Sequence, residues 1–214
     1  MMPTTSPEFV ARKPRPDPPM TAGALRVASI NTLNYFSTID TGRSNCGARG
    51  DDGCRGADSA VELDRQRAKL ALMLALADAD IVGLVEIENN GSAALRSVAD
   101  ALNSASTRTY DFVDAGLVGG DVITTGLIYD STTVSLIGTP GILDSAIDAR
   151  FNDSKNRPAL AQAFRQRSGG GVVSVVVNHL KSKGSNCDDI GDPNRGDGQG
   201  NCNATRTTAA AALA

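Results

Sequence analysis

The sequence predicts a layered α/β sandwich of the α+β class, and three observations carry this prediction. The expected elements run strand, helix, strand, helix and then a series of strands, an order typical of layered α+β folds rather than doubly wound ones. Hydrophobic residues make up 41% of the 214 residues and charged residues 21%, as in globular chains that bury a core. Apolar stretches fall far short of the roughly 18 to 20 residues that cross a bilayer, so we expect no membrane span.

The first half of the chain opens with a βαβ unit. Residues 25–30 (LRVASI) predict a strand, and residues 59–77 predict a helix that begins with a capping box of Ser59 and Glu62. The apolar run over residues 80–87 (DIVGLVEI) predicts a second, buried strand. Because a βαβ crossover joins parallel strands, we expect the carboxyl ends of these two strands to lie together at one edge of the sheet.

The rest of the chain predicts one further central helix and then mostly strands. Turn residues and apolar periodicity place that helix at about residues 92–104. Enrichment in β-branched residues predicts strands near residues 110–113, 122–129 and 134–137. Residues 160–166 and 172–178, connected through SGGG, predict a hairpin. A last helix is expected to begin with a cap at Asn203.

The ends of the chain differ in composition from its middle. Residues 1–23 hold four closely spaced prolines, which predict a stiff linker to an upstream module, with a plain disordered tail as the alternative. Residues 24–214 are expected to form one domain. The final helix reaches Ala214 without a closing glycine or a polar tail, so we expect the domain to continue into a downstream part.

The cysteines form two local pairs in loops rich in Gly, Asn and Asp. They are Cys46 with Cys54 and Cys187 with Cys202, with seven and fourteen residues between the members. A zinc site would need closer cysteine pairs or histidine partners, and the chain holds one His. We therefore predict two disulfides and an extracellular, oxidising location, although no signal peptide is visible at the start of the chain.

The overall composition excludes several classes of binding protein. The net charge of −3 offers no polycationic surface of the kind that coats nucleic acid. Trp is absent and aromatic residues make up 4%, which argues against a base-stacking platform or an aromatic carbohydrate cleft. The chemistry of binding is therefore expected to be polar.

Three polar residues stand at the ends of predicted strands and could form one functional site. Asn31, Glu86 and His179 each stand at a strand end, and the βαβ argument brings the first two to one edge of a sheet. Taken singly, Asn31 is most simply interpreted as a turn residue, Glu86 as a solvent-exposed carboxylate and His179 as a structural hydrogen-bond donor. Taken together, the oxygen ligands suit Mg²⁺ or Ca²⁺, and the histidine suits proton transfer or phosphate contact.

Cations stand close to these strand ends in the sequence. Arg157 precedes the first strand of the hairpin, and its planar guanidinium matches the geometry of phosphate oxygens. Lys181 and Lys183 follow His179 and could contact phosphate in the same way, with a solvated loop as the simpler interpretation.

Five segments carry a family resemblance in chain order: RVASINTLNYF, ADIVGLVEIENN, GLIYD, NRPALAQAF and VVVNHLKSKGS. With the loop that ends in GNCNATRT, they resemble the endonuclease/exonuclease/phosphatase superfamily, especially its large secreted bacterial nucleases related to pancreatic-type deoxyribonuclease. The resemblance runs from Leu25 to Ala214. It implies a four-layer sandwich of two mixed β-sheets flanked by helices, incomplete at the C-terminus, and hydrolysis of phosphodiesters in nucleic acid, with DNA as the expected polymer.

The resemblance also implies roles for individual residues. Asn31 and Glu86 correspond to the metal pair, with Mg²⁺ as the expected ion and Ca²⁺ or Mn²⁺ as alternatives. His179 and Arg157 correspond to catalytic residues, and Arg157 also contacts the phosphate. Substrate binding is extended to Asp121, whose segment lines the same cleft, and to Lys181.

Part of the family pattern is missing from this sequence. In the superfamily a GDxN motif and a later Asp–His pair lie downstream of the point that corresponds to Ala214, and the GDPN at residues 191–194 stands in a cysteine loop instead. We therefore expect a fragment that is poorly stable and inactive alone. The alternatives are a phosphomonoesterase or phospholipid phosphodiesterase of the same superfamily, and a non-catalytic binding remnant.

Overall fold

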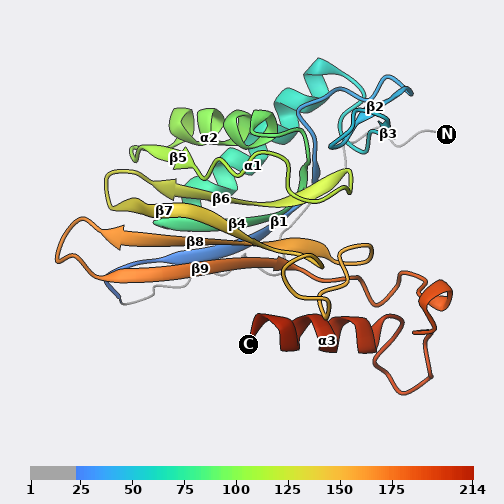
Figure 1. Ribbon diagram of the computed structural model, residues 1–214. Coiled ribbons are helices and arrows are strands. Elements are labelled where there is room, and N and C mark those ends of the chain that lie inside the picture. The colour runs from blue at the N-terminus through green and yellow to red at the C-terminus, as the bar shows by residue number, and fades with distance from the viewer. Residues whose placement is uncertain (1–22) are drawn as a thin grey trace, which may run out of the picture.

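The computed structural model describes residues 23–214, so the predicted linker or tail over residues 1–23 lies outside the described residues except for Gly23. Two β-sheets stack against each other with helices on their outer sides (Figure 1). This arrangement confirms the predicted α+β sandwich. The strands are β1 Val27–Tyr35, β2 Ser44–Cys46, β3 Asp52–Gly53, β4 Ile81–Glu88, β5 Tyr110–Phe112, β6 Ile123–Asp130, β7 Val134–Leu143, β8 Arg157–Gln166 and β9 Val172–His179. The α-helices are α1 Ala60–Ala77, α2 Ala93–Ala105 and α3 Asn203–Leu213, with one 3₁₀ turn at Asp188–Ile190.

The larger sheet has the strand order β1-β4-β6-β5. Strands β1 and β4 are parallel neighbours connected through α1, so the predicted βαβ unit is confirmed. The Ser59 side chain caps α1 by accepting a hydrogen bond from the Glu62 N–H, as the capping box predicts. Strand β1 runs to Tyr35, beyond the predicted end at residue 30, because an irregular stretch inside the strand interrupts the alternation that the sequence pattern relies on.

The smaller sheet is antiparallel, with the order β7-β8-β9, and the predicted hairpin of β8 and β9 is confirmed. Its inner face packs on the larger sheet through a cluster that includes Leu127, Leu160 and Val177. The two sheets approach closely at Gly83, where a Cβ would lie 2.9 Å from a methyl of Val177. This absence of a side chain lets the strand ends of both sheets meet.

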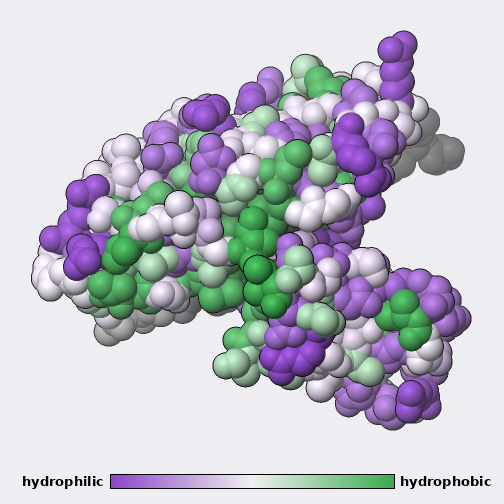
Figure 2. Space-filling model, viewed as in Figure 1, coloured by the Kyte–Doolittle hydropathy of each residue, from purple (hydrophilic) through white to green (hydrophobic). Residues whose placement is uncertain are grey.

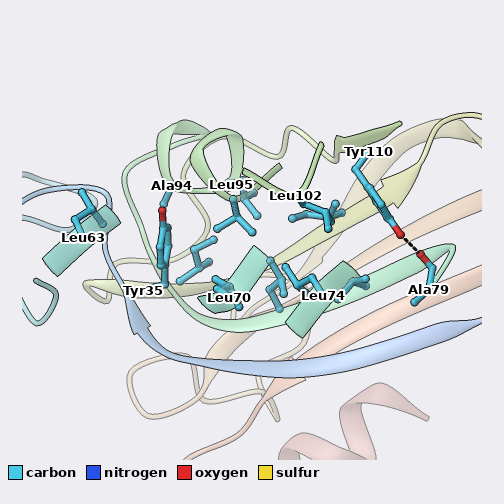
Figure 3. Close-up of a cluster of buried hydrophobic side chains, with 14 of the residues drawn as sticks. Tyr35, Leu63, Leu70, Leu74, Ala79, Ala94, Leu95, Leu102 and Tyr110 are labelled. Atoms are coloured by element: carbon cyan, nitrogen blue, oxygen red, sulfur yellow. Dashed lines mark hydrogen bonds between the residues drawn. The ribbon is translucent and has the colours of Figure 1, made fainter. Parts of the chain in front are cut away.

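Helices α1 and α2 cover the opposite face of the larger sheet. Their buried leucines belong to one hydrophobic cluster with Val82, Leu84 and Ile87 of β4. Figure 3 shows Leu70 and Leu74 of α1 and Leu95 and Leu102 of α2 in this cluster. The Tyr110 hydroxyl closes one end of this cluster by donating to the carbonyl oxygen of Ala79 at 2.9 Å. None of the helices within residues 23–214 combines the length and apolar character needed to cross a bilayer.

Both predicted disulfides are present, Cys46–Cys54 and Cys187–Cys202. The second one ends at the start of α3, which packs on the smaller sheet through Ala209. The predicted cap at Asn203 is wrong by one residue, since Cys202 is the cap residue and Asn203 is the first helical one. The carboxylate of Asp192 instead accepts from the N–H groups of Ala204 and Thr205, so a residue from the disulfide loop caps this helix.

A charged network closes the end of the sandwich opposite to that disulfide. The guanidinium of Arg108 contacts three carboxylates, those of Asp78 at 2.5 Å, Asp80 at 2.8 Å and Asp130 at 2.9 Å. Arg26 also pairs with Asp78. These residues come from the loop before β4, the end of β6 and the loop before β5, so the network ties together the connections at this end.

Candidate functional site

The carboxylate of Glu86 owes its position to a bulge in β4. Val85 pairs with Thr125 and Ile87 pairs with the adjacent Thr124, so three residues of β4 face two of β6. Glu86 is the extra residue and has a left-handed backbone with φ of 63°. Strict alternation would point Glu86 toward the helices, but after the bulge Ile87 takes that place in the helix-side core. The Glu86 carboxylate is thereby free to face the smaller sheet.

The neighbouring strand β1 accommodates the same bulge. Asn31 pairs with Val85 and Tyr35 pairs with Ile87, and Leu33 and Asn34 between them have φ of 55° and 59°. Left-handed backbone at residues other than glycine costs free energy, roughly 1–3 kcal/mol each, and is concentrated at functional sites in proteins. Three such residues, Leu33, Asn34 and Glu86, lie close together near the ends of the neighbouring strands β1 and β4.

Thr32 fastens the two irregular strands to each other. Its hydroxyl lies 3.0 Å from the carbonyl oxygen of Val85 and 2.9 Å from that of Glu86. The adjacent Asn31 accepts a hydrogen bond from the Leu33 N–H through its amide oxygen at 2.7 Å. The structure therefore places Asn31 one strand away from Glu86, with its amide oxygen engaged in a local turn.

His179 ends β9 and meets Glu86 across the gap between the sheets. Its Nε2 lies 3.7 Å from the Glu86 Oε1, too long for a hydrogen bond, and its buried Nδ1 has no partner among residues 23–214. Burial lowers the pKa of His179 and the nearby Arg157 charge lowers it further, while Glu86 acts in the opposite sense with a smaller effect. The imidazole is therefore neutral at pH 7 and holds a single ring proton.

Arg157 pairs with His179 in register across β8 and β9. Its Nη2 forms an ion pair with the Asp121 carboxylate at 2.9 Å, and its buried Nε has no partner within the described part of the chain. The ion pair gives Asp121 a position that the sequence did not indicate. Asp121 orients the guanidinium and balances its charge, and among the described residues the Nε–H stays buried without a hydrogen bond.

Lys181 follows His179 by two residues and completes the group of cations. Its backbone N–H donates to the Asn156 amide oxygen at 2.9 Å, which fixes the chain where it leaves β9. Burial lowers the pKa of the Lys181 ammonium, and the positive charges of Arg157 and Lys155 lower it further. Lys155 itself is paired with Asp189 at 2.6 Å. The ammonium of Lys181 thus lies in a positive field that a bound anion would relieve.

Sequence reasoning missed the residues that hold the loops of this site. Asn89 is fully buried, and its amide nitrogen donates to the carbonyl oxygens of Val118, Gly119 and Asp121 at 3.0 to 3.1 Å. The buried Glu88 carboxylate accepts from the backbone of the loop that follows β1. The sequence did contain a signal for them, because Glu88 and Asn89 stand at the end of an apolar strand. Polar residues that are buried there need hydrogen-bond partners.

The donor set determines which metal these residues could hold. Among residues 23–214 no three His, Cys, Asp or Glu side chains form a group suited to a metal ion. Glu86 provides one carboxylate and Asn31 lies beside it. Mg²⁺ is commonly held by one or two carboxylates together with water and phosphate oxygens, so these residues fit Mg²⁺ shared with a substrate phosphate. Ca²⁺ takes about 6 to 8 oxygen ligands, waters included, so with this pair most of them would come from water and phosphate.

The strand ends described above converge on one end of the sandwich, shown on the right in Figure 1. The loops around β2 and β3 project above this end and the second disulfide loop with α3 projects below it. The outline of the molecule is indented between them (Figure 2). This arrangement brings together Glu86, Asp121, Arg157, His179 and Lys181.

Comparisons with known proteins give structural likenesses only. No family model matches the chain, and no curated protein matches it. An endonuclease/exonuclease/phosphatase family protein from Bacteroides thetaiotaomicron is 16% identical, with a TM-score of 0.46, over 73% of this chain and 50% of that one. A functionally unknown conserved protein from Enterococcus faecalis V583 is 15% identical, with a TM-score of 0.39, over 59% of this chain and 49% of that one.

The human Nocturnin catalytic domain with bound sulfate is 15% identical, with a TM-score of 0.36, over 55% of this chain and 43% of that one. The chain therefore spans half or less of the length of each of these structures. At these values the likenesses carry no argument about activity.

Proposed function

We propose that this chain is the N-terminal part of an extracellular, Mg²⁺-dependent phosphodiesterase of the endonuclease/exonuclease/phosphatase superfamily that hydrolyses nucleic acid, with DNA as the expected polymer. The observation that carries the proposal is the meeting of the Glu86 carboxylate of one sheet and the His179 imidazole of the other at 3.7 Å, beside the Arg157–Asp121 ion pair. The family resemblance of the same segments and the two disulfides support it.

Each residue of the site has a proposed role that follows from its chemistry. Arg157 is oriented by Asp121 and places a fixed positive charge at the site for a phosphate, and Lys181 adds a second positive charge. His179 is neutral and half buried, so it can donate its ring proton to the reacting phosphate or stabilise it by a hydrogen bond. Glu86, with Asn31 beside it, would hold Mg²⁺, which supplies charge stabilisation at the phosphate when bound.

A second candidate is binding of phosphate esters without turnover. It is favoured by the carboxylates near His179: Glu86 is assigned to the metal, and Asp121 is already paired with Arg157. A base that activates water is therefore not provided by the described residues around the imidazole. Phosphomonoesters and phospholipid diesters remain alternative substrates for the hydrolytic proposal.

The test compares hydrolysis of a fluorescent oligonucleotide and of bis(p-nitrophenyl) phosphate in Mg²⁺ and in EDTA. Because the missing motifs predict an inactive fragment, the assay uses a longer protein that carries the GDxN and Asp–His motifs. There we expect activity in Mg²⁺ that falls by at least about 100-fold in His179→Ala and Glu86→Gln. Asn178→Ala is the matched control, since this neighbour of His179 is exposed and should retain activity. Oligonucleotide binding without turnover in the longer wild-type protein would instead favour the second candidate. Equal turnover in all variants would refute both.

A further inference from the structure

Arg55 stands on a loop that is anchored on both sides. It follows Cys54, whose disulfide to the buried Cys46 packs against Phe36 and the start of β6. It precedes Gly56, where a Cβ would lie 2.5 Å from the Cβ of Phe36. A side chain at Gly56 would clash there, so the backbone sits directly on Phe36. The arginine therefore projects from a fixed base.

The same disulfide loop touches the segment that carries Asp121. A Cβ on Gly47, next to Cys46, would lie 3.1 Å from the Cα of Val122. Val122 follows Asp121, whose carboxylate holds the Arg157 guanidinium at 2.9 Å. The loop is thus in contact with the backbone that orients the phosphate-binding arginine. Arg55 also lies close enough to Lys181 for its charge to act on that ammonium, after the larger effects of burial, Arg157 and Lys155.

The cations around the site differ in whether an anion already balances them. Arg157 is paired with Asp121, and Lys155 with Asp189. Within residues 23–214, the exposed Arg55 guanidinium forms no ion pair and no hydrogen bond, and the Lys181 ammonium forms no ion pair. Holding like charges together without counterions is unfavourable, and an anion with more than one charged group relieves it best.

We propose that Arg55 is a specificity-determining residue that binds a second phosphate of the substrate, next to the one held by Arg157 and Lys181. This inference rests on the proposed function and deepens it. The preferred substrate is then a diester flanked by another phosphate, as in a nucleic-acid strand, rather than an isolated diester. A planar guanidinium on a rigid loop suits this contact because it can bind two phosphate oxygens at once with little loss of loop freedom.

Binding is measured first, in EDTA, so that turnover plays no part. The probe is a fluorescent ten-nucleotide single strand, titrated at several salt concentrations with the wild-type chain, Arg55→Ala, Arg55→Lys and Arg49→Ala. We expect Arg55→Ala to raise the Kd about fivefold to tenfold and to reduce the slope of log K against log salt by about 1, with partial rescue in Arg55→Lys. Arg49→Ala is the matched control, because Arg49 lies in the same loop and is paired with Asp51.

Hydrolysis by the longer protein is measured second, in Mg²⁺, with the same oligonucleotide and with bis(p-nitrophenyl) phosphate, which has no flanking phosphate. We expect Arg55→Ala to raise the KM for the oligonucleotide and leave the small diester unchanged. A Kd unaffected in Arg55→Ala, or equal losses for Arg55→Ala and Arg49→Ala, would overturn the inference. Oligonucleotide binding that depends on Arg55 without turnover of either substrate would support the inference and refute the hydrolytic proposal. Absence of binding by the wild-type chain would refute both.

Discussion

The Glu86 carboxylate and the His179 imidazole face each other at 3.7 Å although they belong to different sheets. The contact exists because β4 bulges at Glu86 and turns that side chain away from the helices. It also requires the close approach of the sheets at Gly83 and Val177. The geometry of the candidate site is thus a property of how the two sheets pack, and the variants below test the contacts that maintain it.

The hydroxyl of Thr32 tests the bulge directly. Thr32→Val keeps the shape of the side chain but removes the hydroxyl, whose single proton is shared between the carbonyl oxygens of Val85 and Glu86. We expect the free energy of unfolding to fall by about 1–2 kcal/mol, measured by urea denaturation. Thr32→Ser retains the hydroxyl and should lose less than half as much. Equal losses in the two variants would show that the methyl group, rather than the hydrogen bonds, stabilises this region.

Asn89 tests how the Asp121 loop is held. Asn89→Ala removes the buried amide that binds the carbonyl oxygens of Val118, Gly119 and Asp121 and accepts from the Val118 N–H, so we expect a loss of about 2–3 kcal/mol. Limited proteolysis should then cleave faster within residues 115–121, with the sites identified by mass spectrometry. The exposed Asn178→Ala serves as the control and should leave both readouts unchanged. A destabilised variant whose proteolysis sites lie elsewhere would contradict the assigned role.

Arg108 tests the charged network at the opposite end of the sandwich. Arg108→Met removes the cation from three carboxylates, one of which, Asp130, is almost fully buried. Because an unbalanced buried charge is costly, we expect a loss of about 3 kcal/mol at pH 7. Lys155→Met removes the partner of a single exposed carboxylate, Asp189, and should cost less than about 1 kcal/mol.

The same network predicts the pH dependence of stability. Hydrogen bonds from Arg108 lower the pKa of Asp78. Burial alone would raise the pKa of Asp130, but hydrogen bonds from Thr132 and Arg108 outweigh it and the pKa is lowered. A carboxyl whose folded pKa lies below its unfolded value of 3.8 stabilises the fold above that value and loses this contribution as pH falls. We expect the free energy of unfolding, measured by urea denaturation from pH 7 to pH 2.5, to fall less steeply below about pH 4 in Arg108→Met than in the wild-type chain. Parallel curves would contradict this assignment.

The two disulfides should differ in what they stabilise. By loop-closure entropy, removing Cys46–Cys54 should cost about 2.5 kcal/mol and removing Cys187–Cys202 about 3 kcal/mol. The second loop also carries Asp192, which caps α3, so its paired Cys→Ser variant should additionally lose helical signal in far-UV circular dichroism. The Cys46→Ser/Cys54→Ser variant is the comparison and should keep that signal. Equal helical content in both variants would show that α3 does not depend on its disulfide loop.

The sequence by itself determined the main helices and strands, the parallel βαβ unit and the pairing of the cysteines, but it did not indicate the short strands β2 and β3. Alternation of apolar residues, capping residues and short loop lengths are local signals, and each depends on residues that are near one another in the chain. The capping box at Ser59 and the hairpin of β8 and β9 were predictable for this reason. The cap of α3 was not, because its acceptor, Asp192, lies eleven residues before the first helical residue.

Only the tertiary structure decided where the candidate site residues point. A period of two assigns Glu86 to the helix side, and the bulge that reverses it depends on Thr32 of another strand and on the register with β6. The pairing of Arg157 with Asp121 likewise joins the start of β8 to the loop before β6, 36 residues earlier in the sequence. The sequence was enough to choose the candidate site residues, but the direction of their side chains and the pairing of their charges arise from contacts between sheets, which no local pattern encodes.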